Sequence, residues 1–124
     1  MARQLASGTL GRLRKKLEQE RDRLADLLDE HEQEREEARL AETASERSPD
    51  PMTAEGGSMA FEYEKELSID QNTADLLLKM EHALARIERG EYGICEACAK
   101  PIPVARLEAL PYVTFCVDCA RDRS

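Results

Sequence analysis

Residues 94–120 decide the fold of this chain, and they read ICEACAKPIPVARLEALPYVTFCVDCA. Two Cys-x-x-Cys pairs bound the stretch, Cys95 with Cys98 and Cys116 with Cys119, and 17 residues separate the pairs. Each pair can present two thiolates to one ion, and two pairs complete a tetrahedron with Zn–S distances of about 2.3 Å. The spacing therefore predicts one structural zinc ion, with four protein ligands and no open position for a catalytic water.

Iron binding, disulfides and thiol redox chemistry are the competing interpretations of four cysteines. A thioredoxin-like site needs a single Cys-x-x-Cys pair, so the second pair argues against it. The first residues, Met1-Ala2-Arg3-Gln4-Leu5, contain no apolar signal-peptide core. We therefore expect the protein in the cytoplasm, where cysteines stay reduced and metal binding is favoured over disulfides.

The sequence between the cysteine pairs predicts a small module of mixed structure. The prolines of 101–103 forbid a helix there, residues 104–109 favour a short helix, and 112–115 favour a strand. A module of about 30 residues needs the ion to fold, because so small a core is marginal alone. Its expected core residues are Tyr92, Ile102, Leu107, Tyr112 and Phe115.

Two long helices are predicted before this module. In the first, from about Ser7 to Thr43, leucines recur at three- and four-residue steps, as in the seam of a coiled coil. They are Leu10, Leu13, Leu17, Leu24 and Leu27. The second runs from about Met59 to Arg89, and Gly90 follows it at the position of a C-cap glycine. Its apolar stripe is Ile69, Thr73, Leu77, Met80, Leu84 and Ile87.

The break between the helices, residues 44–58, contains Ser48-Pro49-Asp50-Pro51 and Gly56-Gly57, which disfavour helix. A short break predicts an antiparallel hairpin in which the numbers of facing residues sum to about 101. That register pairs Leu17 with Leu84, Leu24 with Leu77, and Leu13 with Ile87. The alternative is a bundle formed between chains.

The predicted fold is thus mainly α, a long antiparallel two-helix coiled-coil hairpin followed by a four-cysteine zinc-finger module. The expected segments are a frayed tail (1–6), the hairpin (7–89, with its tip near 44–58) and the module with a short charged tail (90–124). We expect a monomer.

The charge of the chain restricts the partners that it can bind. The net charge is −8 and is spread evenly, with −4 in residues 1–60 and −4 in residues 61–124. No cluster of positive charge suits phosphate, so sequence-specific or general nucleic-acid binding is disfavoured, and a positively charged protein surface is the better partner. The acidic run 29–37 is either a solvated helix face or an electrostatic guide into a basic cleft.

Two further classes of protein are disfavoured by the sequence. No segment reaches the ~18 apolar residues of a membrane span. The two histidines, His31 and His82, stand isolated on helices and are expected to be solvated, and no nucleophile lies beside a base in the sequence. We therefore expect neither a membrane protein nor an enzyme.

A family resemblance adds to this interpretation. Residues 89–98 (RGEYGICEAC), Ile102-Pro103, residues 106–109 (RLEA), Pro111 and residues 116–119 (CVDC) resemble, in order, the signature of the TraR/DksA family. The resemblance covers roughly residues 69–120. It implies a transcription regulator that binds bacterial RNA polymerase directly, with the hairpin tip in the secondary channel near the active centre. It also implies an effect on initiation, often together with ppGpp, the alarmone of the stringent response.

The resemblance assigns roles to three further positions. The tip of the family carries Asp-x-x-Asp-x-Ala, and here Asp50 matches its first aspartate, Thr53 replaces the second, and Glu55 stands at the alanine. Asp50 and Glu55 are therefore the candidate contacts with the polymerase active centre. Lys79 matches a basic position associated with ppGpp, and it is a candidate for a weak contact with ppGpp or with the polymerase. Leu110 and Ala120 stand where further basic residues would help to bind the phosphates, so we expect no strong ppGpp binding.

Two functions of other classes remain open at this point. One is a zinc-stabilised coiled-coil adaptor for a different protein. The other is a thiol redox sensor, in which oxidation of the cysteines releases the zinc.

Overall fold

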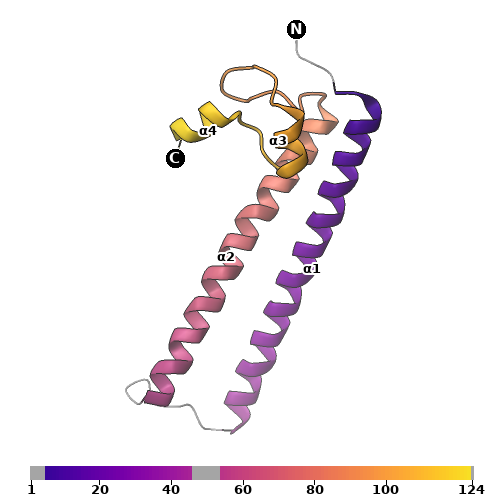
Figure 1. The fold of residues 1–124 in the computed structure, drawn as a ribbon. Coiled ribbons are helices and arrows are strands. Elements are labelled where there is room, and N and C mark those ends of the chain that lie inside the picture. The colour runs from indigo at the N-terminus through magenta and orange to yellow at the C-terminus, as the bar shows by residue number, and fades with distance from the viewer. Residues whose placement is uncertain (1–4, 46–53, 124) are drawn as a thin grey trace. The chain divides into compact units, whose positions relative to one another are not determined.

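The computed structural model describes residues 5–45 and 54–123. Over these residues the chain forms four helices and no extended strand. They are α1 (Ser7–Ser45), α2 (Ala54–Glu88), α3 (Val104–Ala109) and α4 (Val117–Arg123) (Figure 1). The two long helices followed by a four-cysteine module confirm the predicted fold class.

The chain divides into two compact units, and both contain parts of α1 and α2. We call Met1–Asp22 with Leu77–Ser124 the finger unit, and Arg23–Leu76 the hairpin unit. In each unit α1 and α2 of the same chain run antiparallel (Figure 1). The predicted hairpin requires this arrangement, whereas a bundle formed between chains does not. None of the described helices is both long and apolar enough to cross a membrane.

The seam of the finger unit is built from the predicted apolar stripes. Leu13 and Leu17 of α1 are each 1% exposed, and Met80, Ala83 and Ile87 of α2 are buried. The guanidinium of Arg14 pairs with the carboxylate of Glu88 beside this seam. The burial agrees with the expected register, although the individual pairings of leucines across the seam stay predictions.

The register is visible directly in the hairpin unit, where His31 Nδ1 of α1 lies 2.8 Å from Asp70 Oδ1 of α2. The numbers of these two residues obey the predicted sum. The expectation that His31 is merely solvated was therefore wrong.

Ile69 was also misplaced in the predicted apolar stripe of α2: it is 50% exposed, while Asp70 is 8% exposed. Asp70 stands seven residues before Leu77 and fourteen before Leu84, so the heptad period brings Asp70 to the seam.

The two ends of α2 test the predicted boundaries. The helix begins at Ala54, five residues before the predicted start at Met59, so Gly56 and Gly57 are helical. Each glycine costs about 1 kcal/mol relative to alanine, but extending a formed helix is cooperative and tolerates that cost. At the other end, Gly90 has φ 74°. The N–H of Gly90 donates to the carbonyl of Ile87, and the N–H of Glu91 donates to the carbonyl of Arg86. These two hydrogen bonds complete a Schellman cap.

The module after Gly90 differs from expectation in two places. Residues 112–115 form turns and irregular backbone instead of the predicted strand, and the one bridge here joins Ile94 to Pro101. The end of the chain, expected to be a charged tail, forms α4. Arg123 of α4 stacks on the ring of Phe115, 4.5 Å from its centroid, which gives the helix an anchor that composition does not reveal.

The small core of the module largely follows the prediction. Tyr92, Ile102 and Leu107 are buried as expected, and Ile94 joins them. Tyr112 and Phe115 are only half-buried. The short helix predicted over 104–109 is present as α3 and supplies Leu107.

Candidate metal centre

The first cysteine pair lies in a tight backbone turn. The N–H of Cys95 donates to the carbonyl of Lys100 at 2.9 Å, and the N–H of Ala99 donates to the carbonyl of Cys95 at 3.0 Å. These bonds reverse the chain directly after Cys98 and force Ala99 to φ 61°, a left-handed conformation that costs a residue with a Cβ about 1–2 kcal/mol. The turn therefore holds Cys95 and Cys98 on the same side of the loop at a cost in backbone strain.

The second pair belongs to the start of α4. Cys116 directly precedes the helix, and its carbonyl accepts the N–H of Ala120 at 2.9 Å. Cys119 lies in the first turn of α4, where helical geometry returns its side chain toward Cys116. The two turns are joined by the N–H of Glu96, which donates to the carbonyl of Thr114 at 2.9 Å.

The four sulfur atoms form one compact cluster, all within 4.8 Å of one another. Cys98 Sγ and Cys116 Sγ are 3.8 Å apart. The edge of a tetrahedron with Zn–S bonds of about 2.3 Å is also about 3.8 Å, so the cluster fits a zinc ion in size. The structure thus brings together all four predicted cysteines and positions them to bind one metal ion.

The backbone prepares one of these thiols for metal binding. Burial alone would raise the pKa of Cys95, but hydrogen bonds from the backbone of Cys116, Cys98 and Ala97 lower it to about 6. Hydrogen bonds with Cys116 and Cys95 raise the pKa of Cys119 to about 12. Zinc binds the deprotonated form of cysteine, so metal binding would displace the thiol protons of the cluster.

A buried polar network next to the cluster was not anticipated from the sequence. Arg86 of α2 is 7% exposed, and its Nη2 donates to the carbonyls of Glu91 and Ile94, both at 3.0 Å. Its Nη1 lies 3.2 Å from Glu96 Oε1. Arg86 thus clamps the chain on both sides of the turn that leads to Cys95. Its position one turn before Gly90 was the only signal in the sequence.

Glu96, between the first two cysteines, is the centre of that network. Its Oε1 accepts from His82 Nε2 at 2.8 Å, and its Oε2 accepts from Thr114 Oγ1 at 2.5 Å. Burial opposes ionisation of Glu96, but the hydrogen bonds from Thr114 and His82, with the charge of Arg86, hold the pKa of its carboxyl below its ordinary value. His82, expected to be isolated, is therefore a partner of the metal-binding loop.

The module is also tied to the start of α1. Arg12 pairs with the carboxylate of Glu108 on α3, and Lys16 Nζ donates to the carbonyl of Glu108 at 2.9 Å. Inside the module, Tyr92 donates its hydroxyl hydrogen to the carbonyl of Pro111 at 2.8 Å, and burial raises the pKa of Tyr92 to about 12. These contacts fix the cysteine loops to the helices.

The remaining predicted site residues lie elsewhere. Asp50 is outside the described residues, and Glu55 stands in the first turn of α2. Lys79 lines a groove of about 440 Å³ in the finger unit, together with Arg106, Ala120 and seven other residues. Ala120 thus faces the same groove as Lys79 and brings no positive charge to it.

These features define a class of protein, a helical hairpin that carries a four-cysteine metal module. Residues 90–124 match the model of the prokaryotic dksA/traR C4-type zinc finger. The chain is 48% identical over 54 residues to the uncharacterized protein YteA of Bacillus subtilis (strain 168), a match that covers 44% of this chain and 23% of YteA. It is 34% identical over 71 residues to the RNA polymerase-binding transcription factor DksA of Escherichia coli (strain K12), covering 57% of this chain and 46% of DksA.

A solved structure supports the same relationship over more of the chain. The transcription factor DksA2 from Pseudomonas aeruginosa superposes with a TM-score of 0.69 at 25% sequence identity, over 94% of this chain and 84% of DksA2. The chain spans less than half the length of the curated relatives named above. The predicted resemblance to the DksA/TraR family is thus confirmed, and its C4-type finger lies in residues 90–124. The predicted cofactor, one structural zinc ion, is confirmed as well.

Proposed function

We propose that this protein is a transcription regulator that binds bacterial RNA polymerase directly. The observation that carries the proposal is the 34% identity over 71 residues to proteins named as RNA polymerase-binding transcription factors. The arrangement of two long helices and a metal module, shared with DksA2, is the second support. The protein would act in the cytoplasm by binding and would catalyse no reaction.

The proposed mode of action is insertion of the hairpin tip into the secondary channel of the polymerase, where it modulates initiation. Helices of 39 and 35 residues supply the reach, since each residue adds about 1.5 Å along a helix. Asp50 and Glu55 are the proposed contacts with the active centre. The finger, closed by four thiolates, is a structural support in this proposal.

Strong binding of ppGpp is not part of the proposal. Of the residues that the structure describes, Lys79 and Arg106 are the only Lys or Arg side chains that line the groove of the finger unit. The Nε of Arg106 already donates to the carbonyl of Phe115 at 3.2 Å. A polyphosphate would therefore find little free positive charge there.

Direct binding to purified core RNA polymerase tests the proposal. The zinc-loaded, fluorescently labelled chain is titrated with core enzyme, and we expect saturable binding that an unlabelled chain displaces. A folded, zinc-loaded chain that does not bind at micromolar polymerase would contradict the proposal and favour an adaptor for another protein.

Insertion of the tip is tested separately with a photo-crosslinking residue at Met52. Crosslinks to polymerase segments that line the route to the active centre are expected. Crosslinks confined to the outer surface of the polymerase would leave direct binding intact but exclude insertion.

A further inference from the structure

The charge of the chain is concentrated in one of its two units. The hairpin unit, Arg23–Leu76, contains 16 Asp and Glu residues against 5 Lys and Arg, a net charge of −11. The finger unit contains 13 Lys and Arg against 10 Asp and Glu, a net charge of +3 before the thiolates and the metal are counted. The two halves of the sequence have equal net charge and do not reveal this difference, because each unit contains residues from both halves.

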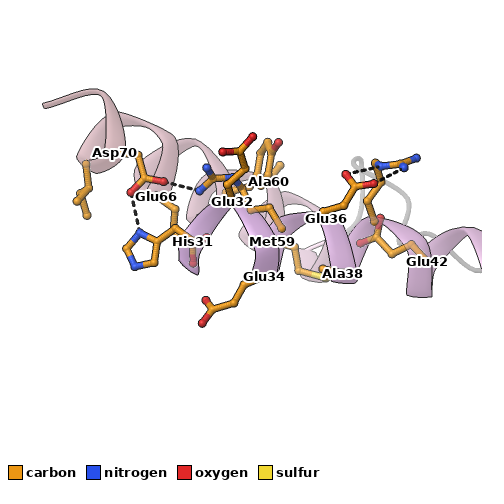
Figure 2. A pocket seen from close by; sticks show the side chains of 14 residues that line it. His31, Glu32, Glu34, Glu36, Ala38, Glu42, Met59, Ala60, Glu66 and Asp70 are labelled. Atoms are coloured by element: carbon orange, nitrogen blue, oxygen red, sulfur yellow. Dashed lines mark hydrogen bonds and ion pairs between the residues drawn. The ribbon is translucent and has the colours of Figure 1, made fainter. Parts of the chain in front are cut away.

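The hairpin unit is also hollowed along its seam. A groove of about 890 Å³ lies between His31–Glu42 of α1 and Met59–Asp70 of α2 (Figure 2). No leucine is among the described residues that line the groove, and α1 presents the small side chain of Ala38 to it. The leucine stripe of α1 ends before this point, so the two helices leave space between them that leucines fill elsewhere.

Apolar side chains and carboxylates line this groove together. Met59 and Tyr63 of α2 are 48% and 53% exposed, a large apolar surface for a helix that faces a partner helix. Glu32 of α1 and Glu66 of α2 also line the groove. Glu32 lies near enough to Arg35 for its charge to help raise the pKa of Arg35. The site thus offers apolar contact area with net negative charge beside it.

The positive side chains in the groove are already neutralised. Arg35 Nη1 lies 2.5 Å from Asp70 Oδ2, and Arg39 Nη2 lies 2.6 Å from Glu36 Oε1 (Figure 2). An anionic ligand would therefore meet net negative charge. A second copy of the unit would bring a further −11, so self-association through this face is opposed.

We propose that the groove is a docking site for a basic segment of RNA polymerase, one that presents an apolar side chain flanked by Lys or Arg. The apolar side chain would lie on Met59 and Tyr63, and the cations would pair with Glu32 and Glu66. The inference rests on the proposed function and adds to it a second contact, separate from the tip and from the finger.

Charge-matched variants test this docking site. Glu32→Gln/Glu66→Gln removes two carboxylates from the groove, whereas Glu62→Gln/Glu64→Gln removes two from the same unit at positions that do not line the groove. Binding to purified core RNA polymerase at low salt should weaken about three- to tenfold in the first variant and less than about twofold in the second. Equal effects of the two variants would show a general effect of charge and would overturn the proposal that the groove is a docking site.

Filling the groove tests the apolar half of the proposal without changing charge. Ala38→Leu places a larger side chain in the groove, and Ala41→Leu makes the same change on α1 outside it. Ala38→Leu should weaken polymerase binding about tenfold while circular dichroism shows an intact helix, and Ala41→Leu should bind as the parent does. A parent chain that does not bind polymerase overturns the proposed function itself. A parent that binds with Ala38→Leu unaffected overturns the docking site alone.

Discussion

The Nδ1 atom of His31 lies 2.8 Å from Oδ1 of Asp70, and this contact joins α1 to α2 within the hairpin unit. Arg35 reaches the other oxygen of the same carboxylate. The hydrogen bond from His31 is the main cause that lowers the pKa of Asp70. The same bond raises the pKa of His31, although desolvation of the imidazole acts in the opposite direction. A seam position that leucine occupies elsewhere is thus held by a hydrogen bond whose strength depends on pH.

The first prediction follows from the signs of these two shifts. The contribution of His31, whose pKa is raised, is complete below about pH 6.5 and is lost as the pH rises through its folded pKa. The contribution of Asp70, whose pKa is lowered, is present above about pH 4 and is lost as the pH falls. The contact should therefore stabilise the hairpin unit most between these values. Hydrogen exchange of amides in 23–45 and 54–76, corrected for intrinsic rates, measures this directly.

The control for this prediction is His31→Gln, which keeps a side chain that can hydrogen-bond but does not titrate. Protonation of the many glutamates will change the stability of both chains at low pH. The difference between parent and variant therefore carries the test. Parallel curves for the two proteins from pH 5 to pH 8 would show that His31 contributes no pH dependence.

The second prediction concerns the metal. Cys95→Ser removes one of four thiols that lie within 4.8 Å of one another, so zinc should be lost and residues 90–120 should unfold. Leu13, Leu17 and Ala83 remain buried between α1 and α2, so most of the helical signal should persist. Elemental analysis and far-ultraviolet circular dichroism measure the two effects. Ala97→Ser, in the same turn, should keep one zinc per chain; a Cys95→Ser protein with full zinc would contradict the assignment.

The sequence predicted most of this architecture because two strong periodic signals carry it. Leucines at heptad spacing identified the helices and their register, and the Cys-x-x-Cys pairs identified the metal cluster. Several of the predictions that were wrong depended on contacts between residues that are not neighbours in the sequence. The predicted stripe of α2 included Ile69 and not the charged Asp70, but His31 and Arg35 pair with Asp70 and make its burial possible. Likewise, apolar β-formers at 112–115 indicated a strand, but the module offers them no neighbouring strand with which to pair.

The third prediction concerns Arg86, which joins α2 to both sides of the first cysteine turn. Arg86→Met should cost about 2–4 kcal/mol of stability, because it leaves Glu96 short of a cation and the carbonyls of Glu91 and Ile94 without their donor. Arg86→Lys should recover only part of that loss, since an ammonium cannot reproduce the planar fork. Thermal unfolding and the rate of zinc transfer to a chelator check both. An Arg86→Met protein that matches the parent in both assays would show that the network adds no stability.

The fourth prediction concerns backbone strain at Ala99. Its φ of 61° disfavours any residue with a Cβ, so Ala99→Gly should stabilise the zinc-bound module by about 0.5–1 kcal/mol. Ala97→Gly, two residues earlier and without positive φ, should be neutral or destabilising, because it adds only freedom to the unfolded chain. Chemical denaturation at fixed free zinc compares the two variants. The prediction fails if Ala99→Gly lowers the midpoint as much as Ala97→Gly does.

The last prediction concerns Asp50 at the tip, which lies outside the described residues. A carboxylate brought near a polymerase active centre can act on the catalytic magnesium or on the basic groups around it, since both attract negative charge strongly in a partly dry channel. Asp50 also precedes Pro51, a sequence typical of a helix N-cap, which would be worth about 1 kcal/mol. Both a regulatory role and a capping role are thus consistent with this residue.

Asp50→Asn separates the two roles, because asparagine caps a helix about as well as aspartate but carries no charge. If Asp50 acts on the active centre, the variant should bind core RNA polymerase as the parent does, keep the thermal stability of the parent, and lose its effect on initiation in a purified transcription assay. Asp50→Ala should lose both the effect and about 1 kcal/mol of stability if the residue also caps the helix. Should Asp50→Asn regulate initiation as the parent does, the charge of Asp50 is not used, and the tip must act through Glu55 or by filling the channel.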